Sequence, residues 1–171
     1  MFVIKLINMK IKVKYINNQL KFNAIGKGEW IDLRSNARFE LDAPKSKYQK
    51  VTYSTTLIPL GVAMQLPKYF EANILPRSST FKNWKITLAN SMGIIDHTYC
   101  GNNDEWLFSA IAFDKSIINA GDRIAQFRIR PSQFAPWWVK LKWLFTNKIE
   151  FIEVDNLEGE DRGGFGSTGT N

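Results

Sequence analysis

Strict alternation of apolar and charged residues marks residues 9–15, the first regular segment of the chain. The odd positions of this segment are apolar or aromatic, and the even positions are all lysine. Because successive side chains of a strand point to opposite faces, the pattern predicts a half-buried strand with a lysine-lined outer face. Such a row of lysines is compatible with nucleic-acid binding, but a solvated face or a protected sheet edge is the interpretation that we favour.

Short strand-like segments, separated by turn residues, continue along the chain. Residues 57–66 form an apolar run interrupted by Pro59 and Gly61, which predicts a bent or edge strand. Glycine, asparagine and aspartate gather at 101–104 and 119–122, which indicates turns. Five further segments have strand-like patterns: 73–75, 85–88, 92–96, 106–113 and 123–130. Many short strands at this spacing predict an all-β fold, either a sandwich, a barrel or a jelly roll.

One segment, residues 136–145, departs from this pattern. Its apolar residues fit helical spacing, but several of them also alternate, so periodicity alone leaves helix and strand open. Pro136 suits the first position of a helix, and we therefore expect a short helix near 136–147. Three of the chain's six tryptophans lie here among lysines. The segment is either a contact surface for a partner or, as we favour, packs against this protein's own sheet or a sister subunit.

Composition narrows the class of protein. A length of 171 residues suits one domain with a proper core, and the formal net charge of +7 favours polyanionic partners such as nucleic acid, nucleotides or an acidic surface. The single cysteine, Cys100, excludes an internal disulfide framework. Residues 1–8 lack the features of a signal peptide, and no stretch approaches the ~20 apolar residues of a membrane helix. We therefore expect a cytoplasmic protein without a membrane partner.

Two segments carry residues that suit phosphate binding. Residues 161–169 combine one arginine with glycines and two hydroxyl side chains, which resembles a cradle of guanidinium, hydroxyl and backbone N–H donors. The alternative is a flexible tail without a role. Residues 76–80 read Pro-Arg-Ser-Ser-Thr, where the arginine offers two parallel hydrogen bonds and the hydroxyls donate to further oxygens.

Candidate catalytic carboxylates lie in two other segments. Asp96 ends the strand-like segment 92–96, where a fixed carboxylate can act as a general base toward water. His97 is its neighbour in sequence, but adjacent strand residues point to opposite faces, so we assign His97 no role. Asp32 suits the water shell of Mg²⁺, an ion that often pairs with substrate phosphates. Gln126, expected on the same strand face as Ile124 and Arg128, needs a polar partner such as a ligand.

These segments resemble, in order, the five motifs of the trimeric dUTPase family (deoxyuridine 5′-triphosphate nucleotidohydrolases). The five ranges are 28–35, 76–80, 90–101, 121–127 and 161–169. The sequences Trp-Ile-Asp-Leu-Arg and Arg-Ser-Ser-Thr are similar to phage and prophage members from Gram-positive bacteria. The resemblance implies a distorted jelly-roll or β-barrel-like subunit of one domain, 1–171. It also implies a homotrimer with shared active sites, and a C-terminal arm, 159–171, that reaches across to a neighbour's site.

The family reaction is the Mg²⁺-assisted hydrolysis of dUTP to dUMP and pyrophosphate, in a host cytoplasm if the gene belongs to a phage. By this resemblance Asp96 activates the attacking water and Asp32 organises the metal's water shell. The positions implied for uracil and deoxyribose are Asn90, Gly93, Ile94, Ile95, Tyr99 and Phe165. The positions implied for phosphate are Arg77, Ser78, Ser79, Gln126, Arg162, Gly166, Ser167 and Thr168.

The chain departs from the family pattern at several places. Trp30 stands where the family has a glycine, and only Gly163 and Gly164 separate the arginine and the aromatic of the last motif. Residues 131–148 look like an insertion and residues 1–8 like an N-terminal extension.

Two alternative functions remain open. A dCTP deaminase of the same superfamily would need a glutamate beside the cytosine amine, whereas the third motif carries Asp96, His97, Thr98 and Tyr99. That composition favours the hydrolase. The other alternative is a regulatory module that binds a protein partner through the segment 136–145.

Overall fold

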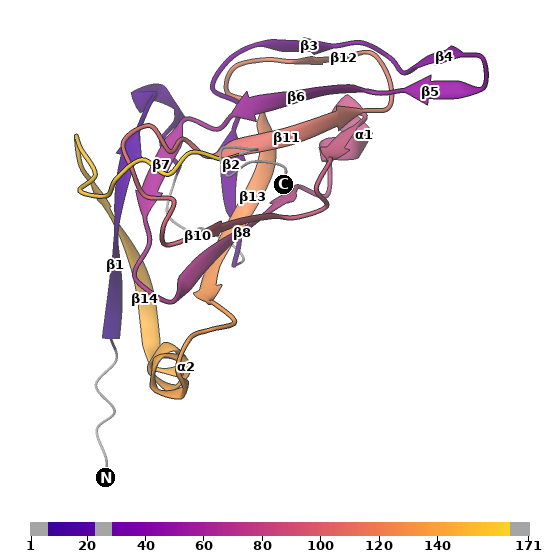
Figure 1. Cartoon of the computed structure of the whole chain (residues 1–171). Coiled ribbons are helices and arrows are strands. Elements are labelled where there is room, and N and C mark those ends of the chain that lie inside the picture. The colour runs from indigo at the N-terminus through magenta and orange to yellow at the C-terminus, as the bar shows by residue number, and fades with distance from the viewer. Residues whose placement is uncertain (1–6, 23–28, 165–171) are drawn as a thin grey trace.

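The computed structural model describes residues 7–22 and 29–164, which form a mostly β subunit (Figure 1). Its strands fall into three larger sheets and two two-stranded ribbons. One sheet has the order β14 (Thr146–Glu153), β1 (Ile7–Tyr15), β7 (Val62–Gln65). A second has the order β10 (Gly93–Asp96), β8 (Phe70–Pro76), β13 (Arg123–Pro131), β2 (Ile31–Arg34). The third has the order β6 (Ser54–Pro59), β11 (Leu107–Ala112), β9 (Ile86–Leu88). The ribbons are β12 (Ser116–Ile118) with β3 (Phe39–Leu41), and β4 (Lys45–Lys47) with β5 (Lys50–Thr52).

The predicted N-terminal strand is confirmed as β1, in which Ile11 and Val13 are fully buried. The interpretation of its lysines as a protected sheet edge is wrong. β1 is the central strand of its sheet, because β14 pairs with it in parallel and β7 pairs with it on the other side. Part of its lysine face is covered instead: Lys12 Nζ lies 2.7 Å from Glu158 Oε1, and Lys14 Nζ donates to Asn102 Oδ1 at 3.1 Å.

The run 57–66 is bent, as its proline and glycine predict. The chain leaves β6 at Pro59 and enters β7 at Val62, so the bend carries it from one sheet to another. Gly61 has φ of +72° at this point, a conformation that a side chain with a Cβ adopts only with strain. Its N–H donates to Glu105 Oε1 at 2.8 Å, which fixes the bend.

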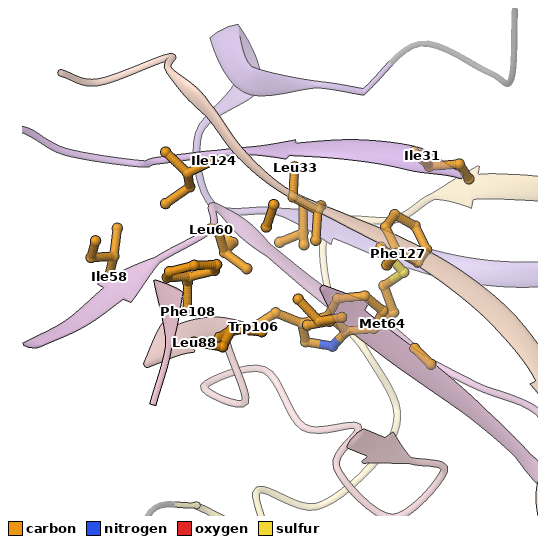
Figure 2. Close-up of a cluster of buried hydrophobic side chains, with 14 of the residues drawn as sticks. Ile31, Leu33, Ile58, Leu60, Met64, Leu88, Trp106, Phe108, Ile124 and Phe127 are labelled. Carbon is orange, nitrogen blue, oxygen red and sulfur yellow. The ribbon is translucent and has the colours of Figure 1, made fainter. Parts of the chain in front are cut away.

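The core lies between the sheets and is built from alternating strand positions (Figure 2). Trp106 and Phe127 are fully buried with ring centroids 5.1 Å apart, in an edge-to-face arrangement that aromatic rings favour. Because Phe127 and Ile129 of β13 point into this core, Gln126 and Arg128 lie on the opposite face of the strand. The core therefore orients the polar side chains of β13 toward a different surface.

Helical segments are few and short: η1 (Asn18–Leu20), α1 (Thr80–Trp84) and α2 (Trp137–Leu144). The helix expected near 136–147 is confirmed as α2, with Pro136 as the residue that caps it, and the alternating strand interpretation is wrong. Trp143 is half-buried and packs edge-on to Phe70 at 5.6 Å, whereas Trp137 is 73% and Trp138 56% exposed. Only one face of α2 therefore packs against the subunit's own sheets. Within the described ranges, no helix has the length and apolar character needed to cross a membrane.

Candidate functional site

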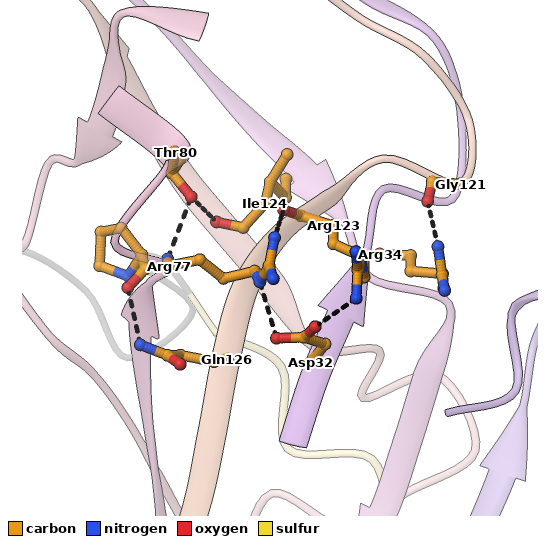
Figure 3. A network of polar contacts seen from close by, with 9 residues as sticks. Asp32, Arg34, Arg77, Thr80, Gly121, Arg123, Ile124 and Gln126 are labelled. Carbon is orange, nitrogen blue, oxygen red and sulfur yellow. Dashed lines mark hydrogen bonds and ion pairs between the residues drawn. The ribbon is translucent and has the colours of Figure 1, made fainter. Parts of the chain in front are cut away.

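The first polar cluster lies where β2, β8 and β13 meet (Figure 3). Asp32 of β2 accepts a hydrogen bond at Oδ1 from Arg77 Nε, at 2.7 Å, and at Oδ2 from Arg123 Nη1, at 3.1 Å. Gln126, the cross-strand neighbour of Asp32, donates from Nε2 to the Pro76 carbonyl oxygen at 3.2 Å. Two guanidinium groups against one carboxylate leave an excess of positive charge, which suits an anionic ligand such as phosphate.

A buried threonine fixes the position of Arg77. Thr80 Oγ1 accepts from the Arg77 backbone N–H at 3.0 Å and donates to the Ile124 carbonyl oxygen at 2.8 Å. This hydroxyl therefore joins the turn that carries Arg77 to β13. Ser78 is exposed and Ser79 is half-buried, both at the start of α1, and Ser79 makes no capping hydrogen bond to the helix. Sequence reasoning assigned no role to Thr80, although it ends the Arg-Ser-Ser-Thr segment.

Arg123 is a second member of the cluster that sequence reasoning missed. Strict alternation along 123–130 would place Arg123 on the strand face opposite Gln126. It would place Ile124 on the same face as Gln126. The pairing of β13 with β2 contains a bulge between Arg123 and Ala125, which reverses the alternation at this point. Ile124 is consequently fully buried in the core, so the expectation that Ile124 shares a face with Gln126 is wrong.

The second polar cluster surrounds Asp96 at the end of β10. Its Oδ1 accepts from the Thr98 backbone N–H at 2.8 Å and from the Thr98 hydroxyl at 2.6 Å. Arg162 Nη1 approaches both carboxylate oxygens, at 3.2 and 3.1 Å, and also donates to Thr98 Oγ1 at 2.9 Å. Partial burial raises the pKa of Asp96, but the hydrogen bonds from Thr98 and the charge of Arg162 outweigh it, so the pKa is lowered. Asp96 is therefore ionised and 44% exposed, facing solvent rather than the core.

Tyr99 lies next to this cluster and is half-buried. Its hydroxyl donates to the Glu105 carbonyl oxygen at 3.0 Å, and the backbone of Gly164 passes close to its ring. Burial raises the pKa of Tyr99, and the nearby carboxylates of Asp104, Glu105 and Asp161 raise it further. The phenol is therefore neutral near pH 7 and presents a flat ring beside the segment that carries Arg162.

The segment proposed to read uracil begins in the turn after β9 and continues along β10. Asn90 lies in this turn, where the Met92 N–H donates to its carbonyl oxygen at 2.6 Å. Gly93, Ile94 and Ile95 belong to β10, which pairs only with β8 among the described residues. A strand at the edge of a sheet presents free N–H and C=O groups, which is what recognition of a base by backbone groups requires. A Cβ at Gly93 would lie 3.2 Å from the Ile74 Cβ, so glycine allows the close approach of these strands.

The two clusters lie at opposite ends of the same sheet. Asp96 is opposite Glu71 at one end of β8, whereas Arg77 directly follows Pro76 at the other. At about 3.3 Å per strand residue, six residues separate the backbones at these two points by roughly 20 Å. The structure thus brings Asp32, Arg77 and Gln126 together, and separately Asp96, Tyr99 and Arg162, but does not unite the two groups within one chain.

Four of the predicted site residues lie outside the part of the chain that the structure describes. Phe165, Gly166, Ser167 and Thr168 fall outside the described residues, as does Gly28 at the start of the first motif.

Trp30, which replaces a family glycine, lies within the described residues. The Arg128 guanidinium lies 4.8 Å from the Trp30 ring centroid, a cation–π contact on the outer face of β13. The larger side chain is thus accommodated by stacking.

The residues present fit a magnesium ion only if the substrate and water supply most of the ligands of that ion. Within residues 7–22 and 29–164 there is no group of three or more His, Cys, Asp or Glu side chains that could hold a metal ion. Asp32 already accepts from two arginines, so it suits contact with a metal's water shell better than direct ligation. Mg²⁺ commonly binds in this way, through one or two carboxylates, several waters and substrate phosphates.

Together, an all-β subunit, a cationic cluster and an ionised carboxylate beside an open strand edge define a protein suited to bind and hydrolyse a phosphorylated nucleotide. A model of the dUTPase family matches residues 32–133. Over 163 residues the chain is 44% identical to the SPbeta prophage-derived deoxyuridine 5′-triphosphate nucleotidohydrolase of Bacillus subtilis, covering 95% of this chain and 99% of that protein. The deoxyuridine 5′-triphosphate nucleotidohydrolase of Rickettsia prowazekii is 33% identical over 164 residues, covering 94% of this chain and 97% of that protein. The chain belongs to the dUTPase family.

Solved structures agree with this assignment at the level of the fold. The dUTPase from Streptococcus mutans superposes with a TM-score of 0.60 at 22% identity, covering 71% of this chain and 93% of that one. A mutant dUTPase from phage phi11 of Staphylococcus aureus superposes with a TM-score of 0.56 at 16% identity, covering 71% and 90%. The all-β fold predicted from the strand pattern is confirmed, and so is the jelly-roll-like subunit that the family resemblance implies.

Proposed function

We propose that this protein hydrolyses dUTP to dUMP and pyrophosphate at sites shared between the subunits of a homotrimer, with Asp96 as the general base. The observation that carries the proposal is the pair of clusters at opposite ends of one sheet. Each cluster supplies half of a nucleotide triphosphate site, and neither is sufficient alone.

Asp96 has the properties that a base for this reaction needs. It is ionised, accessible to solvent and held by Thr98 in one orientation. In the proposed reaction it accepts a proton from water as the water oxygen attacks the α-phosphorus, and the bond to the bridging oxygen of the pyrophosphate breaks. A base held in position typically accelerates such a step by about 10²–10⁴.

Positive charge at two places suits the triphosphate. The first is the cluster of Arg77 and Arg123, to which Gln126 and the hydroxyls of Ser78 and Ser79 add uncharged donors. The second is Arg162, and by the family resemblance the last-motif residues Gly166, Ser167 and Thr168 add further donors to phosphate. These groups stabilise charge rather than react covalently, as is usual in phosphoryl transfer.

In this proposal the residues of the third motif bind the base and the sugar. Fixed backbone donors and acceptors of Gly93–Ile95, with Asn90, match uracil and mismatch cytosine, whose exocyclic amine presents the opposite pattern. The Tyr99 ring packs against deoxyribose where a 2′-hydroxyl would collide, and Phe165 covers the base.

We further propose that the triphosphate binds with Mg²⁺. The phi11 dUTPase structure concerns the coordination of a structural Mg(II) ion in that protein. Here the ion would neutralise charge on the triphosphate, and Asp32 would accept hydrogen bonds from its waters. Arg77 and Arg123 hold Asp32 in place for this role.

A nucleotide panel tests the reaction. The purified protein is incubated with dUTP, dCTP, dTTP or UTP and Mg²⁺, and the release of pyrophosphate and of ammonia is measured for each. Pyrophosphate from dUTP alone is the expected result, with Asp96→Asn as the matched control. Ammonia release from dCTP would instead establish the deaminase alternative.

One observation favours a second, compatible function in binding a protein partner. A groove of about 1180 Å³ lies between α2 and the strands β13 and β14, and Trp137, Leu141 and Leu144 line its helix side. Lys140, Lys148 and other cations surround it. Exposed aromatic and aliphatic side chains with a basic rim are typical of a contact surface for an acidic partner. Among structural relatives, the staphylococcal phage 80alpha dUTPase is described as controlling the transfer of virulence genes.

The partner hypothesis is tested by replacing Trp137 and Leu144 with serine, since both are largely exposed. The expected result is unchanged dUTP turnover and loss of a host protein that the wild type captures and mass spectrometry identifies. If neither protein captures a partner, the surface has no such role. If the variant dissociates into monomers during gel filtration, the groove is instead a contact between subunits.

A further inference from the structure

The ribbon of β4 and β5 is a projecting element that the proposed reaction does not use. Among the described residues its two strands pair only with each other, and the ribbon extends away from the body of the subunit (Figure 1). Every residue of both strands is exposed. A two-stranded hairpin without a buried face is marginally stable in water. Packing within the subunit therefore does not explain which side chains the ribbon carries.

The lysines of the ribbon all lie on one of its faces. Lys47 is the cross-strand partner of Lys50, and Lys45 lies two residues before Lys47. Because paired residues share a face, as do residues two apart on a strand, the three side chains point the same way. Asp42 lies 3.2 Å from Lys45 Nζ, but within the described residues neither Lys47 nor Lys50 has an acidic partner. This face of the ribbon is therefore strongly cationic.

The turn at the tip of the ribbon presents an aromatic ring to solvent. Tyr48 and Gln49 have φ of +50° and +65°, a left-handed conformation that favours glycine or asparagine in such a turn. Tyr48 is 91% exposed, and Lys47 Nζ lies 5.3 Å from its ring centroid. The strained turn and the directly opposed charges of Lys47 and Lys50 both destabilise the ribbon. Departures of this kind from the stable arrangement are typical of segments that bind a ligand.

These groups match the chemistry of a single-stranded nucleic acid. Lysines bind phosphates through charge, without regard to base sequence. An exposed aromatic ring stacks on an unpaired base, whereas the bases of a duplex already stack on one another. The formal net charge of +7 also favours a polyanionic partner. A cationic face that ends in an exposed ring therefore suits a single strand better than a duplex.

We propose that the β4–β5 ribbon binds single-stranded nucleic acid, with Lys45, Lys47 and Lys50 on phosphates and the Tyr48 ring stacked on a base. No residue of the ribbon belongs to either polar cluster, so this binding is separable from dUTP hydrolysis. It is independent of base sequence, because every base offers a face for stacking. It weakens as the salt concentration rises, because the lysines release counterions from the strand.

Fluorescence anisotropy with labelled oligo-dT and oligo-U of about 20 nucleotides tests the lysines across a range of salt concentrations. Replacing all three ribbon lysines with glutamine should weaken binding at about 50 mM salt by about tenfold or more. It should also make the slope of log K against log salt shallower by about 2, since each phosphate contact on a single strand contributes about 0.7. Ribbon-dependent binding of either strand supports the proposal, and the strand that binds more tightly identifies the ligand as DNA or RNA.

A matched control removes the same charge elsewhere. Lys140, Lys142 and Lys148 are exposed on and beside α2, and their replacement with glutamine should retain the wild-type salt slope. Both triple variants should keep the dUTP turnover and the gel-filtration volume of the wild type. An equal loss of oligonucleotide binding in the two variants would show an effect of net charge alone and overturn the proposal. So would a ribbon variant that elutes as a smaller species, because the ribbon would then be a contact between subunits.

The tip residue tests stacking separately from charge. Tyr48→Ala should weaken binding of the single strand by about tenfold and leave the salt slope unchanged. Tyr48→Phe keeps the ring and should bind like the wild type. A duplex of the same length offers no unpaired base, so Tyr48→Ala should not change its binding. Equal losses for single strand and duplex in Tyr48→Ala, or wild-type affinity of the ribbon-lysine variant for the single strand, would overturn the proposal.

Discussion

At the scale of single residues, the state of Asp96 depends on two neighbours. Thr98, two positions later in the chain, donates two hydrogen bonds to Asp96 Oδ1. Arg162, 66 positions later, donates to the same carboxylate from its guanidinium. The local contact orients the carboxylate, and the distant contact supplies positive charge. Asp96 therefore couples the third motif to the arm.

The pKa of Asp96 provides a direct test of this coupling. In the wild-type protein, NMR titration of the Asp96 carboxyl should give a midpoint below the ordinary value of 3.8. Arg162→Ala should raise the midpoint while leaving the contribution of Thr98. Since the folded-state pKa is lowered, this group stabilises the fold above its unfolded pKa, and the contribution is lost as pH falls through the folded value. A midpoint above 3.8, or a midpoint that does not change in Arg162→Ala, would contradict the described contacts.

Replacing the base tests its chemical role. Asp96→Asn keeps the shape of the side chain and removes its ability to accept a proton. We expect dUTP binding, measured by calorimetry with a non-hydrolysable analogue, to remain within a few-fold of wild type, while kcat falls by about 10²–10⁴. A variant with wild-type turnover would show that another group is the base.

Most residues of the two clusters could be predicted from the sequence, and those that were missed share a reason. Asp32, Arg77, Gln126, Asp96 and Arg162 stand in short motifs whose side chains suit phosphate or proton transfer. The roles of Arg123 and Thr80 depend on tertiary contacts: a bulge turns Arg123 toward the Asp32 carboxylate, and the buried Thr80 hydroxyl joins the Arg77 N–H to the Ile124 carbonyl oxygen. Side-chain chemistry alone does not reveal such contacts.

At the scale of elements, alternation predicts which face of a strand is buried but not which strands lie beside it. β1 was recognisable from its pattern, yet its place at the centre of a sheet depends on β14, more than 130 residues further on. The helix in the ambiguous segment 136–145 was predictable from Pro136, but its packing against the sheet depends on the contact of Trp143 with Phe70. The placement of both elements therefore depends on tertiary contacts that periodicity does not contain.

Helix α2 offers a stability test that separates its two faces. Trp143→Ala removes a half-buried ring from Phe70 and should lower the free energy of unfolding by about 1–3 kcal/mol, less than full burial would imply. Trp137→Ala, at a position 73% exposed, should change it by less than about 0.5 kcal/mol. Urea denaturation followed by circular dichroism measures both. Equal effects would mean that α2 does not pack as described.

At the scale of the whole molecule, the length of one sheet determines how a site can be assembled. Asp96 of β10 is opposite Glu71 at one end of β8, and Arg77 follows the other end, so roughly 20 Å of strand separates the two positions. We therefore propose that a nucleotide that contacts both lies between two chains. In that arrangement the oligomer is part of the catalytic mechanism, and each subunit contributes one of the two clusters to a given site.

Mixing two inactive variants tests this claim most directly. Asp96→Asn and Arg77→Ala are each purified, unfolded together in equal amounts and refolded, and dUTP hydrolysis is measured beside each variant refolded alone. If every site takes Asp96 from one chain and Arg77 from another, random assembly leaves about a quarter of the sites intact, and about a quarter of wild-type activity should return. A mixture that stays as inactive as its components would place both residues in the same chain's site and contradict the account.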